Sequence, residues 1–285
     1  MALAVLLLFV LAAAVPCTGQ DSRSTAFEGV PIHYESYGEG SEALVFIHGW
    51  TCDLTFWRGQ APLYRNHRAL LVDLPGHGES GKPRRAYPME FFAGAVEAAM
   101  RDAGVARAVL VGHSLGGPIA YAFLRLFPEK VKALVLVEAE VARGSAGAID
   151  ANAQRARMAR KARGMQRTQG DRRFARSIES MFSENTPEPL RQEIRAKMAA
   201  TPQHVRVAAL TSPSSLPPPP PDEVFDLPSI AIQASSPGTP AGFEAMRRLF
   251  PALRLEAWQG AGHFLMMEDP ERFNRSLETF LAGLP

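Results

Sequence analysis

A serine flanked by glycines is the strongest chemical signal in this sequence. The segment Gly112-His113-Ser114-Leu115-Gly116 follows an apolar run and precedes a stretch with helical periodicity. This context is typical of a nucleophile elbow, a tight turn that projects a serine hydroxyl above a sheet. Glycine is expected at 112 and 116 because side chains there would clash within the turn. The sequence therefore predicts that Ser114 is a nucleophile.

A serine nucleophile needs a general base, and His263 is the candidate. It follows the last apolar run, near the C-terminus, in the segment Gln259-Gly-Ala-Gly-His263. From such a loop an imidazole could take the proton of the Ser114 hydroxyl and return it to the leaving group.

The remaining reactive side chains have plainer interpretations. The other histidines show no spacing typical of metal ligands, so we predict neither a metal nor a cofactor. His113 is expected to face away from the site. Cys52 is expected to be a small packing residue, because no base pairs with it in the pattern. Met266, shortly after the base, is a candidate for contact with the substrate's acyl chain.

These residues need a frame, and the sequence predicts a parallel sheet. Near-continuous apolar runs favour strands buried on both faces, covered by helices. Each predicted site residue follows such a run, as expected at the carboxyl ends of parallel strands. The expected strands are 43–47, 68–73, 108–111, 131–137, 229–232 and 253–258, and the expected helices are 88–103, 115–127, 241–250 and 268–282.

The long interval 141–226 separates two parts of this sheet, 27–140 and 227–285. Helical periodicity at 150–181 and 188–200 predicts a helical cap, and five prolines at 217–221 predict a stiff return to the core. Fourteen Lys or Arg face six Asp or Glu between Arg143 and Arg206. We interpret this excess as a solvated helix face; attraction to anionic surfaces or acidic substrates is the alternative.

The N-terminal segment reads as a targeting signal. Met1–Val15 is wholly apolar but too short to span a membrane. It resembles the core of a secretory signal, which predicts a signal peptide over 1–19 and a secreted or periplasmic protein. Cleavage after Ala14, or an uncleaved segment that holds the protein at a membrane, is the alternative. Cleavage after Gly19 would leave Cys52 as the only cysteine.

Composition bounds the function. The chain has 285 residues, 46% hydrophobic and 21% charged, which fits one elaborated α/β domain. The formal net charge of +2, with no basic tail and no RNA-binding aromatic motif, gives no reason to expect a nucleic-acid partner.

Four segments together resemble the α/β-hydrolase superfamily, in its esterase- and epoxide-hydrolase-like branch. They are His48-Gly49-Trp50, Asp73 to Ser80, Gly112 to Gly117, and Gly262 to Pro270. Serine rather than aspartate at the elbow implies acyl chemistry, most simply a carboxylesterase acting on small or medium esters. The same triad could instead serve a perhydrolase, a lactonase or a carbon–carbon bond hydrolase. A non-catalytic binding module is disfavoured, because the serine, the histidine and the elbow glycines are all present.

The resemblance also implies the remaining site residues. An oxyanion hole would use the backbone N–H groups of Trp50 and Leu115. Most relatives carry the acid after the strand expected at 229–232, but Gln233–Pro240 contains no Asp or Glu. Some use a glutamate after the preceding strand, which predicts Glu138 as the acid and leaves Glu140 as the alternative. A Ser–His dyad, or an acid from the cap, stays open.

Overall fold

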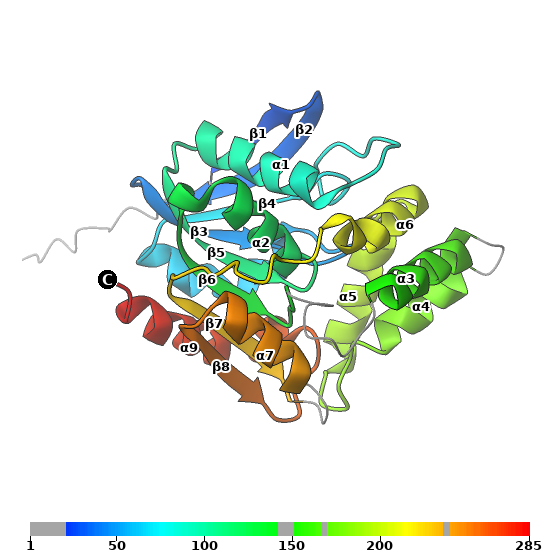
Figure 1. The fold of residues 1–285 in the computed structure, drawn as a ribbon. Coiled ribbons are helices and arrows are strands. Elements are labelled where there is room, and N and C mark those ends of the chain that lie inside the picture. Colours follow the sequence, from blue (N-terminus) through cyan, green and yellow to red (C-terminus); the bar gives the residue numbers. More distant parts are fainter. Residues whose placement is uncertain (1–20, 142–150, 167–169, 236–239) are drawn as a thin grey trace, which may run out of the picture.

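The apolar runs predicted as strands lie side by side in one eight-stranded sheet (Figure 1). The computed structural model describes residues 21–141, 151–166, 170–235 and 240–285. The strand order is β1-β2-β4-β3-β5-β6-β7-β8. β2 is antiparallel to both its neighbours, and every other pair is parallel. The strands are β1 Asp21–Phe27, β2 Val30–Tyr37, β3 Glu42–Ile47, β4 Ala69–Val72, β5 Arg107–His113, β6 Val131–Val137, β7 Ser229–Ala234 and β8 Leu253–Trp258.

Helices cover both faces of this sheet (Figure 1). α1 (Met89–Asp102) packs against α2 (Gly116–Leu126) on one face, while the 3-10 segment η1 (Leu54–Arg65) packs against α9 (Pro270–Ala282) on the other. The shorter elements are η2 Pro128–Lys130, α7 Pro240–Leu249 and α8 Leu265–Glu268. The buried side chains of β3, β4, β5 and β6 form the centre of the core. The prediction of a mostly parallel sheet flanked by helices is confirmed.

A second group of helices lies between β6 and β7 in sequence and to one side of the sheet in space (Figure 1). It comprises α3 Ala151–Gln166, α4 Gly170–Glu179, α5 Glu188–Ala200, α6 Gln203–Thr211 and the short η3 Ser212–Ser215. We call α3 to η3 the cap. Among the described residues, no helix is long and apolar enough to cross a membrane. The predicted signal segment, 1–19, lies outside the described residues.

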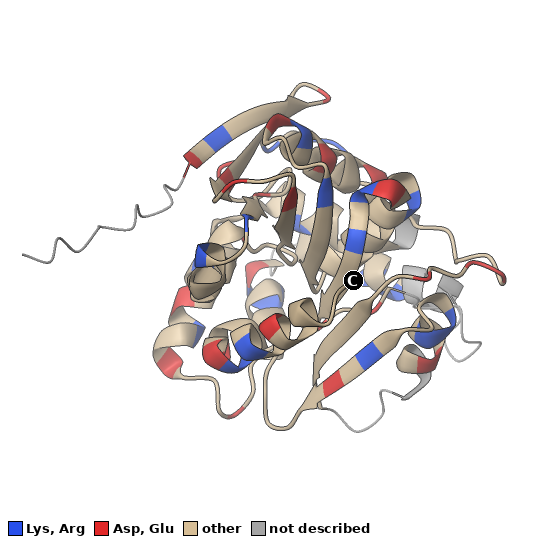
Figure 2. Cartoon of the chain, turned by 90° about the vertical axis from the view of Figure 1, so that its left-hand side faces the viewer, with Lys and Arg blue, Asp and Glu red and all other residues tan. Residues whose placement is uncertain are grey.

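Charge is distributed differently over the core and the cap. On the side of the molecule drawn in Figure 2, Lys and Arg are interspersed with Asp and Glu along the core elements. In the cap, α3 and α4 together carry exposed cations along their length: Arg157, Arg160, Lys161, Arg163, Arg172, Arg173 and Arg176. The only described acids of these two helices, Asp171 and Glu179, pair with Arg206 and Arg195.

Candidate functional site

Ser114 occupies the sharp turn between β5 and α2. Its φ of 51° lies in the left-handed region, which is rare for a residue with a side chain. The turn is tight because a Cβ on Gly112 would lie 2.5 Å from the carbonyl oxygen of Gly116. Such strain persists only where the surroundings enforce it, and it is commonly found at functional sites. The local geometry is that of a nucleophile elbow.

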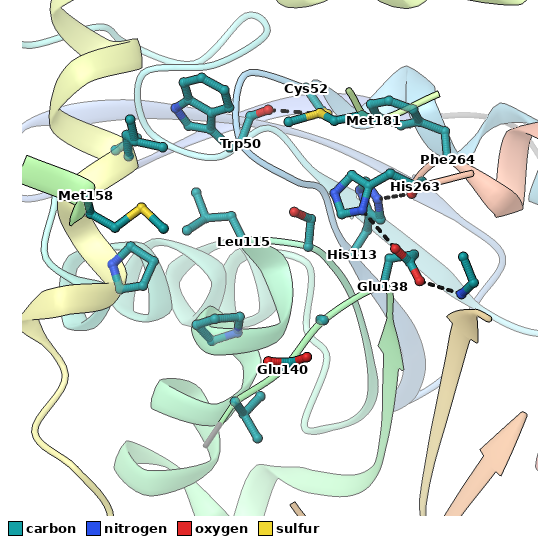
Figure 3. Close-up of a pocket in the computed structure, with 18 of the residues that line it drawn as sticks. Trp50, Cys52, His113, Leu115, Glu138, Glu140, Met158, Met181, His263 and Phe264 are labelled. Carbon is teal, nitrogen blue, oxygen red and sulfur yellow. Dashed lines mark hydrogen bonds and ion pairs between the residues drawn. The ribbon is translucent and has the colours of Figure 1, made fainter. Parts of the chain in front are cut away.

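His263 and Glu138 come from distant parts of the chain and meet by a hydrogen bond. Nδ1 of His263 lies 3.0 Å from Oε2 of Glu138 (Figure 3). Glu138 follows β6 directly, with a left-handed φ of 49°. Its other carboxylate oxygen accepts a hydrogen bond from the backbone N–H of Ala234. The carboxylate is therefore held at both oxygens. Glu140 also borders the cavity but does not make this contact.

Three further contacts hold the loop that carries His263. The backbone N–H of His263 donates a hydrogen bond to the carbonyl of Met181, 2.9 Å away in the cap. Nε2 of His113 lies 2.8 Å from the carbonyl oxygen of His263. One residue earlier, the N–H of Gly262 donates to Glu268 at 2.7 Å. Sequence reasoning gave Glu268 no role, although it lies within the segment that carried the family resemblance.

His113 differs from its expectation. It does not face away from the site: it borders the cavity, and its ring centroid lies 4.9 Å from that of His263. Burial, and then the neighbouring His263, hold the pKa of His113 well below its usual value, so its ring is neutral. Because Nε2 faces a carbonyl oxygen, the single proton belongs on Nε2, where it can donate. His113 thus helps to position the backbone of His263.

A cavity of about 540 Å³ lies between the sheet and the cap, within the size range of small-molecule sites. Ser114, His263 and Glu138 border it from the core, and Met158, Lys161 and Leu210 border it from the cap. Between the described side chains of Ser114 and His263 there is no hydrogen bond. In many hydrolases that bond tightens only when substrate binds.

Two side chains near the cavity are core residues. Met266 is fully buried and is not among the described residues that border the cavity, so the expectation that it contacts substrate is wrong. It is the second residue of the short helix α8, where both it and Leu265 are buried, and its carbonyl accepts a hydrogen bond from Gln60. Cys52 does border the cavity but is only 2% exposed, and burial raises the pKa of its thiol well above the usual value. The thiol is therefore protonated and unreactive at neutral pH.

The loop after β3 lies opposite the elbow. The backbone N–H groups of Trp50 and Leu115 donate to no other described residue, and both residues border the cavity. The Trp50 side chain has a separate task, because its Nε1 donates to the carbonyl of Arg206 at 2.8 Å. Its ring also packs edge-on against Phe174. Trp50 therefore joins the core to the cap at the border of the cavity.

Another buried carboxylate, Asp73, is structural. It is 2% exposed and accepts hydrogen bonds from the backbone N–H groups of Leu54 and Glu79 and from Nδ1 of His33. Burial opposes ionisation, but the bond from His33 and these N–H groups outweigh it, so the pKa of Asp73 is lowered. Within the described residues, no group of His, Cys, Asp and Glu is placed to hold a metal ion.

Comparison with known proteins agrees with this geometry. The model of the alpha/beta hydrolase family matches residues 44–276. The chain is 32% identical over 125 residues to a dihydrolipoyllysine-residue acetyltransferase component of the acetoin cleaving system of Cupriavidus necator, covering 42% of this chain and 33% of that protein. It is 38% identical over 107 residues to a pimeloyl-[acyl-carrier protein] methyl ester esterase of Klebsiella pneumoniae, covering 37% and 40%. The match thus spans about a third of the length of these curated relatives.

Solved structures match over a longer stretch. A thermophilic esterase from Thermogutta terrifontis superposes with a TM-score of 0.76 at 26% identity, covering 93% of this chain and 98% of that one. The family model spans the elbow, the loop after β3, the cap and the His263 loop. The chain therefore belongs to the alpha/beta hydrolase family.

Proposed function

We propose that this protein is a serine carboxylesterase that cleaves small or medium esters through an acyl-enzyme on Ser114. The observation that carries the proposal is the strained elbow of Ser114 on the same cavity as a His263–Glu138 pair joined at 3.0 Å. An aspartate at the elbow would favour attack on epoxides or alkyl halides, whereas a serine favours acyl transfer. The related esterases support the choice of ester substrates.

The first half of the reaction would form the acyl-enzyme. Oγ of Ser114 attacks the ester carbonyl carbon while Nε2 of His263 takes the hydroxyl proton. Glu138 accepts the Nδ1 hydrogen bond and stabilises the imidazolium that forms. The carbonyl oxygen becomes an oxyanion, which the N–H groups of Trp50 and Leu115 would stabilise. The C–O bond then breaks, and His263 returns its proton to the departing alcohol.

The second half would regenerate the enzyme. A water molecule replaces the alcohol, gives a proton to His263 and attacks the acyl carbon. The ester bond to Ser114 then breaks, Ser114 recovers its proton from His263, and the carboxylic acid leaves. Lactones would pass through the same steps with the alcohol still attached to the acyl group. A panel of linear esters and lactones, compared by kcat/KM, separates these substrates.

Covalent labelling tests the nucleophile. A fluorophosphonate probe should add once to the wild-type protein, and peptide mass spectrometry should locate the adduct at Ser114. Ser114→Ala should abolish both labelling and ester hydrolysis, since loss of a triad serine lowers turnover on the order of 10⁶-fold. Ser180→Ala is the matched control, because Ser180 borders the same cavity and should leave both unchanged. Wild-type hydrolysis by Ser114→Ala would refute the proposal.

A further inference from the structure

The proposed reaction does not use the one cationic side chain that borders the cavity among the described residues. Lys161, on α3, is the only Lys or Arg among the described residues that border the cavity. Met158, about one helical turn earlier, borders it too, so this stretch of α3 forms part of the cap-side wall. Most of the neighbouring wall is apolar, including Leu210 and Leu216.

The Lys161 ammonium lies near the indole ring of Trp50. Its Nζ lies 5.7 Å from the centre of the Trp50 ring, within the range of a cation–π interaction. Trp50 borders the same cavity as Ser114, and its backbone N–H is one of the two proposed oxyanion-hole donors. The cation therefore lies beside Trp50, which borders the same cavity as Ser114 and His263, and it reaches that cavity from the cap.

No described carboxylate compensates this charge. Although the Lys161 side chain as a whole is exposed, partial burial of its ammonium and then the nearby Arg157 lower its pKa, and no described acidic group acts in the opposite direction. Glu140 borders the cavity from the core, on the segment after β6, whereas Lys161 comes from the cap. The exposed arginines of α3 and α4 add to the positive potential on the cap side. Such a potential attracts anions and raises their local concentration.

We propose that the substrate carries a carboxylate in addition to its ester, and that Lys161 is the specificity-determining residue that binds this carboxylate. The inference rests on the proposed esterase function. A neutral substrate chain beside Lys161 would displace water from the ammonium without replacing the lost hydrogen bonds. A carboxylate would replace them with a charge-assisted hydrogen bond. A single ammonium matches a single negative charge, which favours a carboxylate over a doubly charged phosphate.

Two matched pairs of esters test this inference. In the first pair the carboxylate lies in the acyl part: the p-nitrophenyl monoester of adipic acid against its methyl-capped diester. In the second pair it lies in the alcohol part: p-carboxyphenyl butyrate against its methyl ester. Release of the phenol gives kcat/KM for each. The wild-type enzyme should prefer the anionic member of at least one pair.

Variants assign that preference to Lys161. Lys161→Met should lower kcat/KM for the preferred anionic ester about 5- to 10-fold, mainly through KM, in the range of a partly desolvated ion pair. It should change the neutral partner less than about twofold, and Lys161→Arg should keep most of the preference. Arg160→Met is the control for the general field, because Arg160 is exposed on the same helix and does not border the cavity.

The outcomes separate the inference from the proposed function. If neutral and anionic esters are hydrolysed alike and Lys161→Met changes both equally, the inference is wrong while the esterase function stands. If Arg160→Met has the same effect as Lys161→Met, the preference comes from the overall field and Lys161 is not the binding residue. If no ester is hydrolysed and no fluorophosphonate adduct forms, the proposed function itself fails.

Discussion

At the scale of single residues, the unusual feature is a glutamate in contact with the proposed base. β6 ends at Val137, and Glu138 turns back with a left-handed φ, which directs its side chain toward His263. The longer side chain of glutamate, compared with aspartate, spans the gap from this strand. The N–H of Ala234, at the end of β7, fixes the second carboxylate oxygen. The end of β7, where most relatives are expected to carry the triad acid, therefore supplies a hydrogen bond to Glu138 instead.

Substitution of the two glutamates tests this role. Glu138→Gln should fold normally and lower kcat for a neutral ester by roughly 10²–10⁴, because an amide neither fixes the His263 tautomer nor stabilises the imidazolium. Glu140→Gln should change kcat little. Steady-state hydrolysis, with circular dichroism as a check of folding, measures both. Loss of activity in Glu140→Gln alone would transfer the role to Glu140, and two active variants would favour a dyad.

The sequence predicted some of these residues for clear physical reasons. Ser114, His263 and Glu138 each follow a strand of the parallel part of the sheet, and parallel strands bring their carboxyl ends to one edge. His113 and Glu268 could not be predicted in the same way. Their hydrogen bonds to the His263 loop depend on how a turn and a short helix pack, and no local pattern encodes that packing. The prediction that Met266 contacts the substrate was wrong, because its nearness to His263 in sequence did not show that its side chain is buried in the core.

At the scale of elements, the loop of the proposed base is tied to the cap. Glu268, at the end of α8, accepts hydrogen bonds from the backbone of Gly262 and from the hydroxyl of Thr186 in the cap. The carbonyl of Met181, also in the cap, accepts a hydrogen bond from the backbone N–H of His263. Displacement of the cap would therefore disturb the proposed base. Trp50 links the cap to the opposite wall through its bond to Arg206.

Loss of Glu268 should reveal this connection. Glu268→Ala removes two partly buried hydrogen bonds, each worth about 0.5–1.5 kcal/mol, so the free energy of unfolding should fall by about 1–3 kcal/mol. We also expect kcat/KM to fall about tenfold, because His263 loses support. Urea unfolding and ester hydrolysis measure the two effects. Glu271→Ala is the control, since Glu271 is exposed on the adjacent helix and should affect neither. Unchanged activity in Glu268→Ala would show that the loop is held without it.

The sequence predicted the buried strands and helices more reliably than the exposed ones. The central strands are continuous apolar runs because helices cover both faces, so their positions could be read directly. β1 and β2 were not predicted. β1 is an exposed edge strand with a mostly polar sequence, and the local sequence pattern does not encode its pairing with β2. α6 was also missed, since it is short and only two residues separate it from α5.

At the scale of the whole molecule, three histidines are enclosed as neutral rings. His48, His77 and His113 are each at most 1% exposed. Burial lowers the pKa of all three, that of His77 to about 3. His33 behaves oppositely, because its hydrogen bond with Asp73 raises its pKa. The native state thus keeps these three imidazoles uncharged, so its stability depends on pH.

Acidification should destabilise the fold well before the carboxylates titrate. Below about pH 6.5 the unfolded chain binds protons at these three histidines while the native state does not, so the free energy of unfolding falls with pH. One such histidine contributes a slope of up to about 1.4 kcal/mol per pH unit. For His77 the loss should continue down to its native pKa of about 3. His33 has the opposite effect at higher pH, because its raised native pKa stabilises the fold as the pH falls toward about 6.5, and below that pH its contribution is constant.

The contribution of His77 can be isolated by substitution. Asparagine at 77 can still donate to the carbonyl of Pro75, which Nδ1 of His77 contacts at 3.0 Å, but it has no proton to bind in this pH range. We expect His77→Asn to be less stable at neutral pH, because it leaves a cavity, yet to lose stability less steeply between about pH 6.5 and pH 4, by up to about 1.4 kcal/mol per pH unit. Urea midpoints across this range measure the slope, with His204→Asn on the surface of α6 as the control. A slope equal to that of the wild type would mean that His77 takes up its proton in the native state, and that burial does not hold it neutral.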